Sequence, residues 1–309
     1  MSQPNKPVEK ITVYGFGPLR LSDKFLDPSA FVTKVIAFCV HNKIPFAFDA
    51  TAKFSSKSGR CPWIKVEFAN LGQNQLAPPP LIVDDSEKCI KALGELYNVD
   101  MDSHLTADQK VQSENLRYVV ESVLYFALLR SIWVDNPQWV AREVGLAIPD
   151  FMRSFVLNQV RKDTITTLNL HGNGDLSDEE SHAVAANIYR NIALILGDKK
   201  FLFSNERPSS VECGLLRYVD NIEDDEVTPA AVKKVFQENP RLVEYGRRLK
   251  AALLPAEAFK AKLAEGRKSN ADGTAFVTGM MRKLGAVAVV VIGAAGYGVY
   301  QWLKAYHYI

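Results

Sequence analysis

The sequence is poor in cysteine and has no two cysteines close together. Its four cysteines, Cys39, Cys61, Cys89 and Cys213, are scattered, with no CxxC motif and no histidine at ligand spacing. A structural zinc site and a dithiol redox site both need closely spaced ligands or thiols, so the sequence predicts neither. Scattered, unpaired thiols also indicate a reducing compartment.

The chain also lacks an excess of charge of either sign. Its 309 residues include 37 Lys and Arg against 35 Asp and Glu, which gives a formal net charge of +2. A protein that binds nucleic acid neutralises phosphates with an excess of basic side chains, so we expect no nucleic-acid partner. A hydrophobic fraction of 47% is typical of a chain that folds, and the length leaves room for two domains.

The N-terminus lacks a targeting signal. Met1–Lys10 holds neither the apolar run of a secretory signal nor an Arg-rich amphipathic segment. We therefore expect no cleavable presequence, and we expect any targeting signal to lie in the C-terminal tail.

One long apolar run is present, at Leu284–Leu303, where Gln301 is the only strongly polar side chain. A helix that rises ~1.5 Å per residue needs roughly 20 apolar residues to cross a hydrocarbon layer of ~30 Å, which this run just reaches. The alternative is a buried helix of a soluble core, but no later segment is long enough to cover it. The sequence therefore predicts a tail-anchored protein. Basic and aromatic side chains flank the run, as at a membrane surface: Arg282, Lys283, Tyr297, Tyr300, Trp302, Lys304, Tyr306, His307 and Tyr308.

Residues 1–98 have the pattern of a small α/β domain. The order β-α-β followed by β-β-α is typical of a thioredoxin-like fold. In that fold the proline that opens the third strand follows a cis peptide bond, and Pro62 is the candidate for it. The predicted strands are Lys10–Tyr14, Phe46–Thr51, Trp63–Phe68 and Leu81–Val83, and the predicted helices are Ala30–Val40 and a segment from Asp85 to about Tyr97.

Residues 99–255 have helical signals instead. Two long helices are predicted, at Asp108–Trp133 and Ser181–Leu196. The polar, Gly-containing residues 256–283 are expected to form a linker to the span at 284–303. The predicted fold is α+β, with a thioredoxin-like N-terminal half, an all-helical C-terminal half and a C-terminal transmembrane helix. Three pairs have the capping-box spacing that begins a helix: Thr106 with Gln109, Ser177 with Glu180, and Ser209 with Glu212.

A thioredoxin-like half joined to a helical half resembles the glutathione transferase fold, and several stretches resemble more specifically the branch of metaxins and failed axon connections proteins. The likeness covers residues 10–250. The chain departs from the pattern where Lys200 replaces a proline, in an extra polar segment at Leu19–Asp27, and in a longer loop at Ala69–Pro79. The matching stretches are Gly59–Ile64, Asp85–Ser86, Asp100–Leu105, His171–Gly174, Ser177–Glu180, Leu196–Phe203, Pro208–Glu212 and Asn239–Tyr245.

The resemblance implies where glutathione and its thiolate would be held. In glutathione transferases a Tyr, Ser or Cys near the start of the first helix stabilises the thiolate, which points to Ser29, with Tyr14 less well placed. Ser29 also has a simpler explanation as a helix cap. No perturbed acid–base pair is visible, so the cap is favoured and we expect no catalytic residue.

The peptide part of glutathione is held in that family by the backbone before the cis-proline and by an acid–Ser pair. These features point to Cys61, Pro62, Asp85 and Ser86 as glutathione contacts. Here too a structural explanation is favoured, because Pro62 forms a turn and Ser86 caps a helix. We expect no bound metal and no cofactor, and glutathione is the one cofactor that the sequence leaves open.

Three functions remain open at this point. The first is a non-enzymatic, metaxin-like adaptor in mitochondrial protein import or membrane-complex assembly. The second is a membrane-tethered glutathione transferase, and the third is an accessory structural subunit of a larger mitochondrial membrane complex. The short span with positive charge on both sides resembles tail anchors of the mitochondrial outer membrane, with the body in the cytosol. Expected partners are the membrane and other membrane-complex proteins, in a hetero-oligomer through the helical half.

Overall fold

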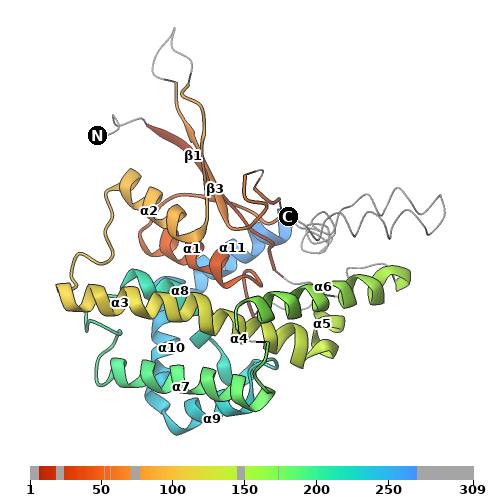
Figure 1. Ribbon diagram of the computed structural model, residues 1–309. Helices are drawn as coiled ribbons and strands as arrows, with labels where there is room; N and C mark the ends of the chain where they lie inside the picture. The colour runs from red at the N-terminus through yellow and green to blue at the C-terminus, as the bar shows by residue number, and fades with distance from the viewer. Residues whose placement is uncertain are drawn as a thin grey trace.

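The chain folds into a four-stranded sheet with its helices, followed by a larger helical half (Figure 1). The computed structural model describes residues 7–18, 24–51, 53–55, 57–70, 77–144, 150–172 and 174–269. Within these ranges, no helix is both long and apolar enough to cross a membrane. The predicted span Leu284–Leu303 lies outside the described residues.

The N-terminal half has the predicted thioredoxin-like order. Its strands pair in the order β2-β1-β3-β4, with β1 parallel to β2 and β3 antiparallel to both β1 and β4. The peptide bond between Cys61 and Pro62 is cis, as predicted. The elements are β1 (Val8–Tyr14), α1 (Ala30–His41), β2 (Ala47–Asp49), β3 (Trp63–Phe68), β4 (Leu81–Asp84) and α2 (Ser86–Tyr97).

The two faces of this sheet differ in character because side chains alternate along each strand. Val13 and Ile64 are cross-strand partners on the face that α1 and α2 cover, and both are fully buried. Tyr14 and Trp63 are partners on the other face, where they share the surface with Lys65. The first face forms the core of this half, and the second carries aromatic and charged side chains.

The helical half begins with one long helical stretch that includes two π-helical segments. The three predicted capping boxes, at Thr106, Ser177 and Ser209, are all present. Helix α1 packs on α8 and so joins the two halves. The elements are α3 (Ala107–Val119), η1 (Val120–Leu124), α4 (Tyr125–Arg130), η2 (Ser131–Asp135), α5 (Pro137–Glu143), α6 (Asp150–Leu170), α7 (Asp178–Leu196), α8 (Ser210–Val219), η4 (Ile222–Asp224), α9 (Ala230–Glu238) and α10 (Pro240–Leu253).

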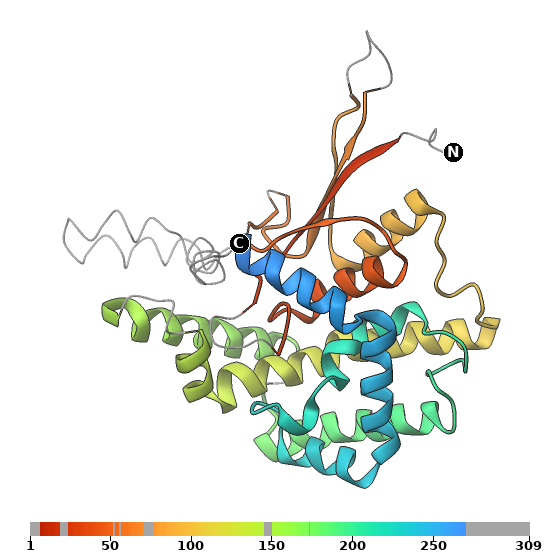
Figure 2. The ribbon, with the colours of Figure 1, turned by 180° about the vertical axis from the view of Figure 1, so that it is seen from behind.

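The polar segment after residue 255 differs from the expectation of a linker. Residues 256–269 form a further helix, α11 (Ala256–Ser269), which packs against β2 at the edge of the sheet (Figure 2). Phe259 and Leu263 contact the apolar core on its inner side. The remaining residues of the expected linker, 270–283, lie outside the described residues.

Candidate functional site

The residues that the sequence proposed as a glutathione site lie around one end of the sheet. Tyr14 pairs with Trp63, and Trp63 pairs with Asp84, so three strands have neighbouring residues at this end. The chain leaves β1 and β4 here and enters β3 here. The start of α1, the Cys61–Pro62 bond and the start of α2 therefore lie around the same end.

The buried carboxylate of Asp27 holds the β1–α1 connection in place. It accepts hydrogen bonds from the backbone N–H groups of Phe16 (2.7 Å), Gly17 (2.8 Å) and Ser29 (2.8 Å). Removal from water raises the pKa of Asp27 to about 7, although the three N–H donors favour its charged form. Asp27 thus ties the end of β1 to the first residues of α1.

Ser29 caps a helix in this structure. Its Oγ accepts a hydrogen bond from the backbone N–H of Val32 at 3.4 Å, and its backbone has the extended conformation of an N-cap residue. The hydroxyl therefore serves one of the unpaired backbone donors of α1. The structural explanation given for Ser29 from the sequence matches this geometry.

Tyr14 lies on the face of the sheet away from α1. Its ring stacks flat on that of Trp63, with centroids 3.7 Å apart and planes 2° from parallel. Burial, followed by the nearby carboxylate of Asp49, raises the pKa of Tyr14 and keeps its phenol protonated. Since Ser29 belongs to the helix on the opposite face, the structure does not bring these two hydroxyls together.

The remaining proposed contacts are also held by local bonds. The Sγ of Cys61 donates to the carbonyl of Lys53 at 3.3 Å. Asp85, rather than Ser86, caps α2: its Oδ1 accepts from the backbone N–H groups of Glu87 (3.0 Å) and Lys88 (3.2 Å). Ser86 is buried in the first turn. The sequence placed the cap one residue too late, because an acid and a serine both favour this position.

A buried lysine beside this end of the sheet was missed by the sequence analysis. Lys34 of α1, whose side chain is 2% exposed, forms ion pairs with Glu87 of α2 and Glu121 of η1. Gly214 of α8 packs against it, and a Cβ there would lie at an ordinary contact distance of 3.6 Å from the Lys34 side chain. One signal was available: Lys34 interrupts the apolar run of α1, where a lysine is rarely buried unless it is paired.

The ion pairs extend beyond Lys34, and the whole cluster holds two cations and three carboxylates. Glu121 also pairs with Arg117 at 3.4 Å, and Arg117 pairs with Glu114 at 2.6 Å. Beside this cluster, the rings of Phe31 and Tyr125 meet with centroids 4.9 Å apart. Paired charges and packed rings occupy the contact between the halves. This arrangement stabilises the interface and leaves no cation of the cluster unpaired for a thiolate.

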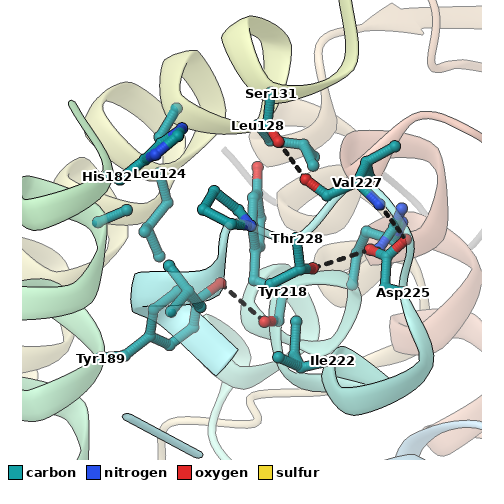
Figure 3. A pocket seen from close by; sticks show the side chains of 15 residues that line it. Leu124, Leu128, Ser131, His182, Tyr189, Tyr218, Ile222, Asp225, Val227 and Thr228 are labelled. Carbon is teal, nitrogen blue, oxygen red and sulfur yellow. Dashed lines mark hydrogen bonds and ion pairs between the residues drawn. The ribbon is translucent and has the colours of Figure 1, made fainter. Parts of the chain in front are cut away.

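A small hollow lies inside the helical half (Figure 3). Leu124 and Ser131, from the two π-helical segments, lie on one wall, and Tyr189 and Tyr218 lie on the other sides. The Tyr218 hydroxyl points into this hollow and has no hydrogen-bond partner among the described residues. The cavity measures about 40 Å³, whereas pockets for drug-sized ligands measure roughly 300–1,000 Å³. It has room for about three water molecules and not for a peptide.

The described part of the chain offers no metal centre: no group of three or more His, Cys, Asp or Glu side chains there could hold a metal ion. The polar hollow at the end of α7, of about 260 Å³, is lined by both signs of charge. Its Arg241 is paired with Asp198.

Comparisons with known proteins find one family model and several solved structures. Residues 30–138 match the family model of the glutathione S-transferase N-terminal domain. The chain is similar to a solved poplar glutathione transferase F1 mutant, at 11% identity over 84% of this chain and 99% of that one, with a TM-score of 0.44. It is also similar to glutathione transferase Omega 1C from Trametes versicolor, at 13% identity over 85% and 96%, with a TM-score of 0.45.

The family match includes β2, β3, β4 and the cis bond before Pro62, whereas β1 precedes it. The matched region runs from the first residue of α1 into α5, and so includes the contact between the halves. This protein therefore has a thioredoxin-like sheet followed by a helical half, and its residues 30–138 resemble a glutathione S-transferase N-terminal domain.

Proposed function

We propose that this protein is a non-enzymatic, metaxin-like adaptor, anchored by its C-terminal span in a mitochondrial membrane. We place it in the outer membrane with its body in the cytosol, where it acts in protein import or in the assembly of a membrane complex. The helical half offers the surface for its protein partners.

The observation that carries this proposal is the engagement of every candidate thiolate stabiliser in another role. Ser29 caps α1, and Tyr14 is stacked on Trp63 on the far face of the sheet. The ammonium group of Lys34 is paired with two carboxylates. Activation of a thiol needs a donor or a cation aimed at the sulfur. At this end of the sheet, Ser29, Tyr14 and Lys34 each make a contact that stabilises the fold instead.

Removal of Leu284–Ile309 is expected to convert the protein from a membrane-bound to a soluble, folded form. The reason is that this segment contains the long apolar run on which the anchor prediction depends. The measurement is carbonate extraction of mitochondria, with the full chain as the control. A full chain that carbonate releases contradicts the anchor. Added protease should digest the body in intact mitochondria, and protection until the outer membrane is opened contradicts the proposed orientation.

A membrane-tethered glutathione transferase is the second candidate, because Ser29, the Cys61–Pro62 bond and Ser86 lie around one end of the sheet. The adaptor proposal expects little or no conjugation of glutathione to an electrophile by the full chain in detergent. It expects Ser29→Ala to lower the free energy of unfolding by about 0.5–2 kcal/mol, as for a lost helix cap.

The same assay decides against the adaptor if it finds robust turnover that depends on Ser29. An activating donor is worth about 10²-fold or more in rate, so a loss of that size in Ser29→Ala favours the enzyme. Ser29→Thr is the matched control, because threonine also caps helices and keeps a hydroxyl. Slow turnover that is equal in all three proteins agrees with the adaptor.

A further inference from the structure

Helix α11 is fixed to the edge of the sheet by hydrogen bonds that follow the pattern of a strand. β2 is an edge strand, so alternate residues along it present unpaired backbone groups outward. Side chains of α11 satisfy three such groups in order. Lys262 Nζ donates to the carbonyl of Phe46 (2.7 Å), Glu265 Oε1 accepts from the N–H of Phe48 (2.7 Å), and Ser269 Oγ accepts from the N–H of Ala50 (3.0 Å).

Close packing adds to these bonds. Gly266 faces the sheet, and a Cβ there would lie 3.0 Å from Phe48 and 3.0 Å from Pro18, so the helix approaches more closely than a side chain permits. The Lys262 ammonium lies 3.9 Å from the centre of the Phe46 ring. These contacts fix which side of α11 faces the sheet. The helical repeat then determines which residues face outward.

That outer face is basic and has no large apolar side chain. Lys260, Arg267 and Lys268 are exposed on it, against one exposed carboxylate, Glu257. At 100° per residue, these four positions fall on one side of the helix, together with the exposed Ala261 and Ala264. Figure 2 shows α11 on the outside of the molecule, with α7 at the far end of the helical half.

We propose that the outer face of α11 lies against the anionic surface of the membrane and so orients the body, with α7 directed away. This inference rests on the proposed tail anchor. Fourteen residues, 270–283, separate Ser269 from the start of the predicted span, which limits their separation to about 50 Å. Since Ser269 accepts a hydrogen bond from Ala50, directly after β2, the last described residue of α11 lies at the sheet edge, beside the basic face. Anionic headgroups attract Lys and Arg side chains placed next to a membrane span.

The test uses the full chain, inserted into vesicles of phosphatidylcholine with or without phosphatidylserine. A fluorophore is attached at Ala264→Cys on the outer face of α11 or at Leu194→Cys on α7, where Leu194 is 79% exposed. Both are made with Cys61→Ser, because the other three cysteines are buried. The readout is energy transfer to an acceptor lipid in the vesicle surface.

We expect transfer from position 264 to be several-fold greater than from position 194, and to fall when phosphatidylserine is omitted. Reversal of Lys260, Arg267 and Lys268 to glutamate should remove the difference. The charge-conserving set Lys260→Arg, Arg267→Lys and Lys268→Arg is the matched control and should keep it. Carbonate resistance is measured for every variant, so that insertion of the span is assessed separately.

Equal transfer from the two positions in carbonate-resistant protein overturns this inference and leaves the anchor in place. Loss of carbonate resistance in the unaltered chain overturns the anchor, and this inference with it. A third outcome is equal transfer from the two positions in vesicles, together with a label at 264 that is shielded from solvent only in native mitochondrial membranes. This outcome assigns the basic face to an acidic protein partner and overturns the lipid assignment.

Discussion

Replacement of Lys34 by methionine is expected to lower the free energy of unfolding by about 3 kcal/mol, near the lower end of the range for removing one partner of a buried ion pair. Methionine keeps the length of the side chain, so the main loss is the charge. It leaves the carboxylates of Glu87 and Glu121 without their shared cation. The lower end applies because these two side chains are 37% and 21% exposed, and water screens them in part.

The measurement is urea unfolding of the tail-deleted body. The double variant Lys34→Met, Glu87→Gln should be more stable than Lys34→Met alone, because it removes the carboxylate that loses its ion pair, whereas Glu121 keeps Arg117. Arg241→Ala is the control for an exposed ion pair and should change little, since Arg241 and Asp198 are 71% and 87% exposed. A Lys34→Met protein as stable as the wild type contradicts the proposed role of this cluster.

Because Lys34 links elements of both halves, its loss should also weaken the coupling between them. In the wild type, α1 packs on α8 and its lysine reaches η1, so the halves are expected to unfold together. In Lys34→Met the transitions followed by far-ultraviolet circular dichroism and by tryptophan fluorescence should separate, which is the sign of a lost two-state transition. If the two transitions still coincide in Lys34→Met, contacts other than those of Lys34 couple the two halves.

Local patterns in this sequence predicted the structure well, and distant pairings did not. The capping boxes at Thr106, Ser177 and Ser209 each need only two residues three positions apart, so the sequence contains the whole interaction. The partners of Lys34 lie 53 and 87 residues away in the chain. Only the lysine itself was visible, as an interruption of an apolar run.

Helix α11, which the sequence analysis expected to be part of a linker, shows a second limit of prediction from the sequence. Lys262, Glu265 and Ser269 made the segment look like a solvent-exposed connection. The same polar groups bind the free edge of β2, and such an edge can be recognised only once the strand order is known. A polar helix that covers a strand edge and a polar linker have the same composition, and they differ only in what they contact.

Replacement of Glu212 by alanine is expected to have the largest effect on the helical half, with a loss of about 4 kcal/mol or more in the free energy of unfolding. Glu212 is 0% exposed. Its carboxylate accepts hydrogen bonds from Ser209 N (2.7 Å), Ser209 Oγ (2.9 Å), Leu202 N (3.0 Å) and the Tyr245 hydroxyl (2.9 Å). Each buried donor left without a partner costs about 1–3 kcal/mol, and alanine leaves all four.

The Glu212 carboxylate stabilises more than a helix start, and two further variants separate its contributions. It joins the first turn of α8 to the loop at Leu202 and to Tyr245 of α10, so three segments depend on one side chain. Tyr245→Phe removes only the α10 bond and should cost about 1 kcal/mol. Glu212→Gln keeps the volume but places an amide opposite N–H donors, so it should fall between these two variants. Thermal unfolding followed by circular dichroism measures the order. Equal losses in Glu212→Ala and Tyr245→Phe contradict the shared role, because they reduce the carboxylate to a single bond with α10.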